Sequence, residues 1–136
     1  MNTSSILLVD DNEDGLDMYR QYLIYRGYRV VLARSGEEAI VQARAHRPNV
    51  ILLDVRLPRM TGTDVMRVLR ADATFQDTPI VALTAHALHN ARKDALEAGF
   101  DEWIPKPCLP EELVLAVERI LSTARKSKVT EKRDVV

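Results

Sequence analysis

The sequence predicts an α/β domain built on a five-stranded parallel sheet. Short apolar runs alternate five times with longer segments of helical periodicity along the 136 residues. The runs at 6–9 and 50–53 are apolar at every position, which is typical of strands buried on both faces of a sheet. At this length, the expected arrangement is a doubly wound, flavodoxin-like sheet with strand order 2-1-3-4-5, right-handed crossovers and helices on both faces.

Each expected strand is followed by an expected helix. Strands are expected at residues 6–9, 28–32, 50–53, 79–84 and 102–104. The expected helices are 13–26, a helix that opens with the capping-box pair Ser35 and Glu38, a helix marked by Val65 and Leu69, 90–98, and a last helix that begins near Pro110. The polar segment 72–78 is expected to be a turn, and the apolar stripe of the last helix ends at Leu121.

The domain is expected to span residues 1–123, followed by a frayed basic tail or the start of a linker at 124–136. The tail carries five basic and two acidic residues, which leaves 14 basic and 18 acidic residues in the body, a net charge near −4. Contacts to phosphates need clustered Lys and Arg. The acidic body therefore argues against nucleic acid as a partner of the domain itself.

Cysteine usage and hydropathy indicate the compartment. Cys108 is the only cysteine, so no intramolecular disulfide can form, and a reducing compartment fits best. No apolar run is long enough to span a membrane. The apolar segment near the N-terminus lacks a positive flank and is interrupted by Asp10 and Asp11, unlike a signal peptide. The expected location is the cytoplasm, without membrane contact.

Four of the expected strands end in polar groups that carry chemistry: Asp10 and Asp11, Asp54, Thr84, and Lys106. In this fold the ligand crevice lies at the carboxyl edge between strands 1 and 3, so the three carboxylates are expected to meet there. Carboxylates this close repel one another, and oxygen-only ligands favour Mg²⁺. A cation, an ammonium and a hydroxyl around one carboxylate are recurring parts of phosphoryl transfer, with the carboxylate as nucleophile.

Four motifs occur in the expected order along this edge: Val9-Asp10-Asp11, Asp54-Val55-Arg56-Leu57-Pro58-Arg59-Met60-Thr61-Gly62, Ala82-Leu83-Thr84-Ala85, and Trp103-Ile104-Pro105-Lys106-Pro107. Each motif alone is unspecific. Together they resemble the receiver (response-regulator) domain of two-component signalling, whose chemotaxis member has the strand order given above. The resemblance extends from residue 5 to about residue 122.

The resemblance implies a phosphoacceptor site. Asp54 would accept a phosphoryl group from a histidine of a kinase or of a phosphotransfer protein. Asp11, Asp54 and the backbone carbonyl of Arg56 would bind Mg²⁺ or Mn²⁺ directly, and Asp10 would act partly through water. The domain would lose the phosphoryl group slowly by itself and would not turn over a separate substrate.

The resemblance also implies a switch. Thr84 and Lys106 would contact the phosphoryl oxygens, and the Lys106-Pro107 peptide would be cis. Trp103 falls at the family's switch aromatic, which is usually Tyr or Phe. Phosphorylation would draw Thr84 inward and let Trp103 turn in, which would reshape the face of helix 4, strand 5 and helix 5. A downstream protein effector is expected to bind this face of a monomer or weak phosphorylation-dependent dimer.

Two neighbouring residues are expected to set the lifetime of the phosphoryl group. Arg56 lies two residues after Asp54, and His86 lies two residues after Thr84. These positions vary within the family and are expected to hinder or steer the attacking water. The expected output surface comprises Leu88, Ala91, Lys93, Trp103 and the outward side of 111–119.

Other functions stay open on the residues alone. An aspartate-nucleophile phosphohydrolase of the haloacid-dehalogenase type would need a second Asp where this chain has Arg56. A flavin or nucleotide module would need a Gly-rich loop after the first strand. A receiver-like scaffold would not need the complete acceptor set. Taken singly, Asp10 could be a helix N-cap, Thr84 a strand residue and Trp103 a core residue.

Overall fold

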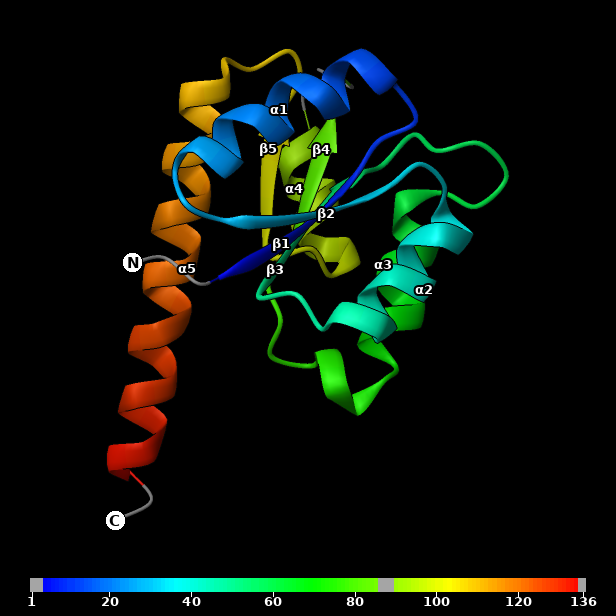
Figure 1. Cartoon of the computed structure of the whole chain (residues 1–136). Helices are drawn as coiled ribbons and strands as arrows, with labels where there is room; N and C mark the ends of the chain where they lie inside the picture. The colour runs from blue at the N-terminus through cyan, green and yellow to red at the C-terminus, as the bar shows by residue number, and fades with distance from the viewer. Residues whose placement is uncertain (1–3, 86–89, 135–136) are drawn as a thin grey trace.

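The structure is a computed structural model that describes residues 4–85 and 90–134, with the backbone alone described for residues 124–134. Five parallel strands form one sheet in the order β2-β1-β3-β4-β5 (Figure 1). The strands are β1 (Ser5–Val9), β2 (Arg29–Ala33), β3 (Val50–Asp54), β4 (Ile80–Thr84) and β5 (Glu102–Pro105). The predicted fold class and strand order are confirmed.

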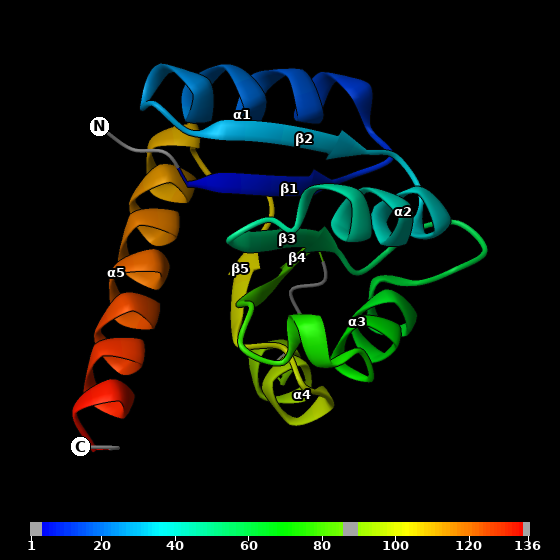
Figure 2. The same ribbon diagram turned by 60° about the horizontal axis from the view of Figure 1, so that its bottom comes forward.

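The helices cover both faces of this sheet. They are α1 (Glu13–Tyr25), α2 (Gly36–His46), α3 (Gly62–Arg70), α4 (Ala91–Ala98) and α5 (Pro110–Asp134). α1 and α5 pack on one face and share a hydrophobic cluster with it, whereas α2, α3 and α4 pack on the other (Figures 1 and 2). Because all strand pairs are parallel, the carboxyl ends of the strands lie at one common edge, which is where the polar motifs lie.

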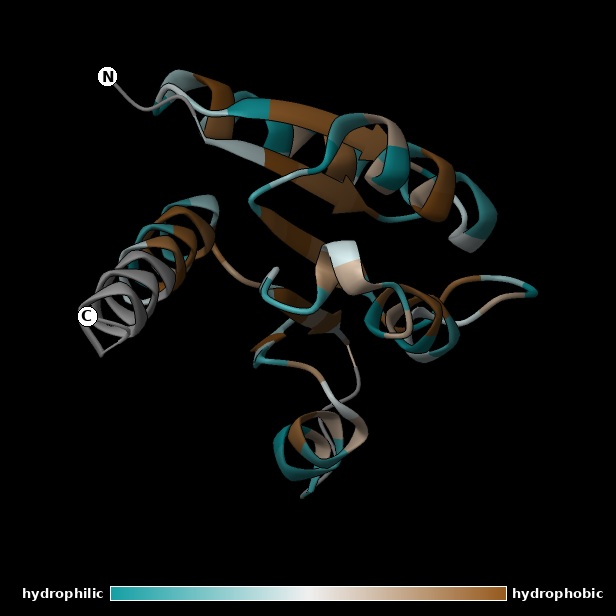
Figure 3. Cartoon of the chain, turned by 90° about the horizontal axis from the view of Figure 1, so that it is seen from below, coloured by the Kyte–Doolittle hydropathy of each residue, from teal (hydrophilic) through white to brown (hydrophobic). Residues whose placement is uncertain are grey.

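The central strands are buried along their whole length. Every residue of β3 and β4 is buried, and successive side chains point to opposite faces. Leu52 and Val81 pack against α1 and α5, while Ile51 and Ala82 pack against the helices of the other face. This two-sided burial explains why the run 50–53 has no polar residue. Figure 3 shows the strands coloured as hydrophobic between helices with hydrophilic outer sides.

The N-cap of α1 is Asn12. Its side-chain oxygen accepts hydrogen bonds from the backbone N–H groups of Asp14 at 3.0 Å and Gly15 at 3.2 Å. Asp10 is therefore not the cap, and its carboxylate is directed to other partners. At α2, Ser35 caps as expected and accepts from the N–H of Glu38 at 3.1 Å.

The segment 72–78 is more ordered than a polar turn. It contains the 3₁₀ helix η1 (Ala73–Phe75), in which Phe75 is only 1% exposed. Arg70 donates to the backbone carbonyls of Phe75 and Thr78, each at 2.8 Å, and pairs with the carboxylate of Asp101. One guanidinium thus joins the end of α3 to the segments before β4 and β5.

α5 continues as a helix to Asp134, well beyond Leu121, where its apolar stripe ends. The expectation of frayed chain after residue 123 is wrong for the backbone of 124–134. No Gly or Pro occurs between 111 and 134, and Ala, Lys, Glu and Arg in this stretch all favour helix. That 124–136 begins a linker stays a prediction. Within the described part of the chain, none of the helices has the length and hydrophobicity needed to cross a bilayer.

Candidate functional site

The carboxyl ends of β1 and β3 bring three acidic side chains together. The strands pair with Val9 opposite Leu53, so the next residues, Asp10 and Asp54, lie beside each other at the edge of the sheet. One carboxylate oxygen from each of Asp10, Asp11 and Asp54 lies within 4.8 Å of the others. The strand order alone is sufficient to produce this cluster.

Asp54 lies below the surface and is 6% exposed. Its Oδ1 accepts a hydrogen bond from the backbone N–H of Arg56 at 2.9 Å, and its Oδ2 lies 3.5 Å from Nζ of Lys106. These two contacts come from the loop after β3 and from the segment after β5. The carboxylate is therefore held by a local backbone contact and by a side chain that is distant in the sequence.

Asp10 and Asp11 differ in exposure. Asp10 is 2% exposed, whereas Asp11 is exposed to solvent. Oδ1 of Asp10 accepts from the backbone N–H of Asn12 at 3.0 Å, and its Oδ2 accepts from Nζ of Lys106. Asn12 therefore binds Asp10 through its backbone and caps α1 through its side chain, which couples the start of the helix to the acidic site.

The charges of the site act on one another. Burial raises the pKa of Asp54, an effect to which Asp10 adds and which the Arg56 N–H and the Lys106 ammonium oppose. Burial by itself would lower the pKa of Lys106, but the hydrogen bond to Asp10 and the charges of Asp54 and Asp10 outweigh it, so this pKa is raised. Lys106 therefore stays a cation and offsets only part of the negative charge of the three carboxylates.

The donor atoms of the acidic cluster fit a hard divalent cation. All three side chains offer carboxylate oxygens, and the group contains no His or Cys. Mg²⁺ and Mn²⁺ prefer such oxygen ligands, together with water, which the exposed Asp11 leaves room for. The residues present are thus suited to these ions, as expected from the sequence.

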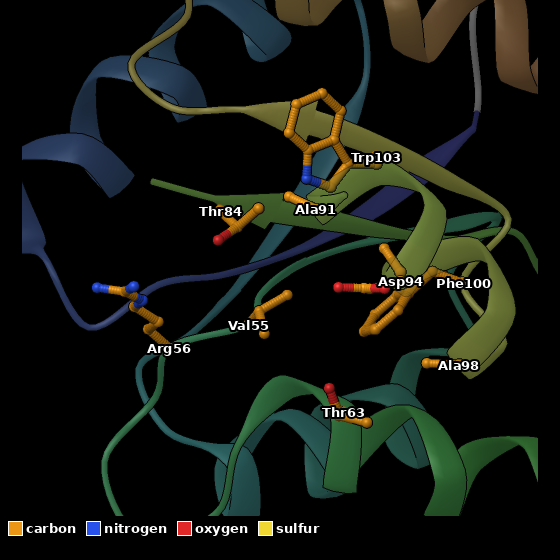
Figure 4. A pocket seen from close by; sticks show the side chains of 10 residues that line it. Val55, Arg56, Thr63, Thr84, Ala91, Asp94, Ala98, Phe100 and Trp103 are labelled. Carbon is orange, nitrogen blue, oxygen red and sulfur yellow. The ribbon is translucent and has the colours of Figure 1, made fainter. Parts of the chain in front are cut away.

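Thr84 and Trp103 lie on the same face of the sheet. Ala82 pairs with Trp103 and Thr84 with Pro105, and side chains two residues apart share a face. Both residues line a cavity of about 390 Å³ that also reaches Arg56 (Figure 4). Thr84 is buried and Trp103 is partly buried. The Lys106–Pro107 peptide bond is cis, as the resemblance implied.

The sequence matches one protein family over most of its length. The family of the response regulator receiver domain matches residues 6–118. The chain belongs to the response regulator receiver family. Receiver domains of response regulators act in two-component signalling with histidine kinases and downstream effectors, and they are in general signalling domains rather than enzymes. Membership favours this function over the phosphohydrolase and the nucleotide module.

Two curated relatives illustrate the range of proteins that carry such a receiver. The chain is 31% identical over 122 residues to the polar-differentiation response regulator DivK of Brucella ovis, covering 90% of this chain and 99% of DivK. It is 40% identical over 116 residues to response regulator MprA of Mycolicibacterium vanbaalenii, covering 85% of this chain. The chain spans 49% of MprA, so it corresponds to about half of that protein.

Solved receiver structures have the same fold. Chemotaxis response regulator CheY4 of Vibrio cholerae is 31% identical and superposes with a TM-score of 0.82 over 88% of this chain and 99% of that one. A response regulator from Chloroflexus aurantiacus is 34% identical, with a TM-score of 0.83 over 89% of this chain and 99% of that one. The strand order and the helices on both faces are thus those of the CheY-like receiver.

Two features of this receiver escaped the sequence reasoning. Asn12 is the residue that joins α1 to Asp10, and its position two residues after Asp10 is the signal that could have identified it. The cavity next to Thr84 had no signal in the sequence, because small residues such as Ala95 and Ala98 are frequent on any helix. His86 and Leu88 lie outside the described residues.

Proposed function

We propose that Asp54 of this receiver accepts a phosphoryl group from a phosphohistidine of a histidine kinase or a histidine phosphotransfer protein. The observation that carries the proposal is the setting of the Asp54 carboxylate: buried, beside two further carboxylates and 3.5 Å from an ammonium. A carboxylate that only stabilised the fold would not need two acidic neighbours, because like charges in one place destabilise the folded state.

The chemistry follows from these groups. A carboxylate oxygen of Asp54 attacks phosphorus, the P–N bond of the phosphohistidine breaks, and the imidazole nitrogen leaves with the electron pair. Lys106 supplies positive charge to the phosphoryl oxygens, and the hydroxyl of Thr84 donates a hydrogen bond to one of them. The backbone N–H of Arg56 keeps Asp54 oriented during the attack. The transfer is accelerated by positive charge and hydrogen-bond donors that are already in position around the phosphoryl oxygens, and not by a proton transfer.

Asp10, Asp11, Asp54 and the backbone carbonyl of Arg56 would hold Mg²⁺, or Mn²⁺ in its place. When bound, the ion neutralises the negative charge that the carboxylates and the phosphoryl group bring together. Asp10 is already engaged by Lys106 and by the Asn12 N–H, so we assign it a part through water.

Phosphorylation would be read out through Thr84 and Trp103. Their common face of the sheet and their common cavity allow a movement of Thr84 toward the phosphoryl group to be followed by the indole. The surface of α4, β5 and α5 would then change and bind a protein effector, with Lys93 and the outward side of 111–119 in the contact. Ala91, which the sequence placed on this surface, is buried and is left out of the contact. His86 and Leu88 belong to this proposal but lie outside the described residues.

The proposal also covers the lifetime of the phosphoryl group, the location of the protein and its oligomeric state. Arg56 and His86 would tune the slow loss of the phosphoryl group, and the chain would turn over no separate substrate. The domain of residues 1–123 would act in the cytoplasm as a monomer or a weak phosphorylation-dependent dimer. It would bind no nucleic acid by itself and no membrane, and 124–136 would form a tail or the start of a linker.

Acetyl phosphate with Mg²⁺ tests the phosphoacceptor. Intact mass should increase by one phosphoryl group in the native protein and not in Asp54→Ala, while the exposed Asp17→Ala should behave as the native protein. Chelation of Mg²⁺ should prevent the increase. A mass increase that survives Asp54→Ala, or its absence in the native protein, would refute the proposal. Repeated turnover of a small phosphoester would favour the phosphohydrolase instead.

A further inference from the structure

A cavity lies between α4 and the sheet, next to the acidic site, with which it shares Arg56 and Thr84. Its volume is about 390 Å³, within the range of about 300–1,000 Å³ that is typical of small-molecule sites. The walls are mostly apolar: Val55 directly after β3, Phe100 in the connection between α4 and β5, and the small side chains of Ala91, Ala95 and Ala98 along α4. Small residues along the helix and the aromatic ring of Phe100 leave a space suited to a flat, mainly apolar group.

Besides Arg56 and Thr84, three polar groups face this space. The Asp94 carboxylate and the Thr63 hydroxyl point into it, and the nitrogen of Trp103 is directed toward its interior (Figure 4). Nε1 of Trp103 is buried and has no hydrogen-bond partner among the residues that the structure describes. A buried N–H without an acceptor is costly, so a native structure that contains one needs an explanation.

We propose that this cavity binds a small planar aromatic heterocycle of the azole type. One ring nitrogen of the ligand accepts a hydrogen bond from Nε1 of Trp103, and an N–H on its other edge donates to the carboxylate of Asp94. The flat ring fills the space between Phe100 and the alanines of α4. Aliphatic or donor-only ligands fit the chemistry less well, because they leave the indole N–H unpaired in an apolar site.

Occupancy of the cavity also regulates the receiver, a step that rests on the proposed function. Thr84 and Trp103 line the cavity and are the two residues that phosphorylation is proposed to move. A ligand that holds the indole in its present position opposes that movement. By reciprocity, phosphorylation must then weaken ligand binding by the same factor.

Benzimidazole and indole are the matched probes for this site. They have the same shape, but only benzimidazole has a ring nitrogen that can accept a hydrogen bond. Trp103 is the only tryptophan, so its indole N–H gives a single unambiguous signal in a ¹H–¹⁵N NMR spectrum of the full chain. We expect benzimidazole to shift this signal saturably, with a Kd on the order of 0.1–1 mM, as for other nine-atom fragments, and indole to bind at least about tenfold more weakly.

Two variants with matched controls locate the binding. Ala98→Leu fills the cavity and should abolish the shift, whereas Ala71→Leu, at the exposed end of α3, should leave it unchanged. Asp94→Asn keeps the volume and should weaken binding several-fold, with the exposed Asp17→Asn as its control. If Ala98→Leu does not fold, the comparison of Asp94→Asn with Asp17→Asn tests the location of the binding site. The site would be refuted if benzimidazole caused no saturable shift of the Trp103 signal, or if indole bound as tightly as benzimidazole. It would also be refuted if Asp94→Asn left benzimidazole binding unchanged.

Asp54→Ala separates the two parts of the inference. It should bind benzimidazole as the native protein does, because Asp54 does not line the cavity. Acetyl phosphate with Mg²⁺ should weaken benzimidazole binding in the native protein and have no effect in Asp54→Ala. Binding in both proteins without this weakening would refute the regulation and keep the site. A native protein that takes no phosphoryl group would refute the proposed function, and with it the regulation, and leave the site standing.

Discussion

Nζ of Lys106 lies 3.5 Å from Oδ2 of Asp54 and also donates to Oδ2 of Asp10. A single ammonium thus joins the ends of β1, β3 and β5. The same contact sets up a competition, because any cation held by the carboxylates must share them with Lys106. If the proposed function holds, the position of this one lysine is expected to affect both metal affinity and phosphoryl transfer, and the two effects can be measured separately.

Lys106→Met should bind Mg²⁺ more tightly, by about an order of magnitude, because the competing positive charge is gone. It should also take up phosphoryl from acetyl phosphate far more slowly, because the transferred group loses its positive partner. Calorimetric titration and intact mass measure the two effects. The exposed Lys93→Met, which removes a surface pair with Glu97, is the control and should change neither. Equal or weaker Mg²⁺ binding in folded Lys106→Met would contradict the competition.

Asp54→Asn should stabilise the receiver at neutral pH by a few degrees in Tm. Burial raises the pKa of Asp54 in the folded state, so its contribution to stability is full below the ordinary Asp pKa and is lost as pH rises through the raised value. At pH 7 the charged carboxylate therefore costs stability, and Asn removes that cost. The gain should shrink as pH falls toward the ordinary Asp pKa of about 4, because the raised pKa of Asp54 favours the neutral acid there. Thermal unfolding at both pH values tests this, with Asp17→Asn as an exposed control that should show no such gain.

The sequence was informative about the site because its groups lie where strands end. The buried runs before Asp10 and Asp54 predict parallel neighbours, and the topology then brings the carboxylates together, as the structure has them. Lys106 is harder to place, because its contacts with Asp10 and Asp54 depend on a turn after β5 whose path no periodicity encodes. The end of the fifth strand placed Lys106 at this edge, and the resemblance implied its contact with the phosphoryl oxygens, but neither predicted its contact with Asp10.

What escaped prediction depends on single side chains. Phe75 is one apolar residue in a polar stretch, a weak signal in the sequence, yet it is fully buried and fixes η1. Arg70 resembles any surface arginine in the sequence, but its guanidinium reaches two carbonyls and Asp101. α5 extends past Leu121 because helix propensity continues where amphipathic patterning stops.

Gly62→Ala should destabilise the receiver by about 1–3 kcal/mol. A Cβ at this position would lie 2.7 Å from Cα of Val55 and would also clash with the backbone carbonyl of Asp54. Gly62 begins α3 and donates to the carbonyl of Val55 at 3.0 Å, so it closes the loop that follows Asp54. Urea unfolding measures the loss, and phosphoryl uptake should fall because Asp54 moves.

Gly15→Ala is the matched control for Gly62→Ala. The nearest atom to its new Cβ is Oδ2 of Asp10 at 3.6 Å, an ordinary contact, and Gly15 lies within α1. This substitution should stabilise the chain by about 0.5–1 kcal/mol, because Gly is a poor helix former. Equal loss of stability in the two variants would show that the crowding at Val55 is not the cause.

Tyr19→Phe should cost about 1 kcal/mol at neutral pH, because Tyr19 donates a hydrogen bond to the carbonyl of Cys108 at 3.0 Å. Burial, followed by the contact with the Cys108 side chain, raises the pKa of Tyr19 to about 12. The contribution of the neutral phenol is therefore full below the ordinary pKa of about 10 and is lost as pH rises through about 12. The difference between the urea midpoints of the native protein and Tyr19→Phe should be smaller at about pH 11 than at about pH 7. The exposed Tyr22→Phe should show no difference at either pH.

Arg56→Asn should shorten the lifetime of the phosphorylated receiver by about tenfold, equivalent to about 1.4 kcal/mol in the barrier. The substitution keeps the backbone N–H that holds Oδ1 of Asp54 and removes only the exposed guanidinium, which we expect to shield the phosphoryl group from water. Arg59→Asn is the matched control. Arg59 lies in the same loop and has a φ of +67°, a conformation that Asn tolerates. Intact mass, followed over time after removal of acetyl phosphate, gives both half-lives. Equal half-lives would assign the lifetime to groups other than the side chain of Arg56.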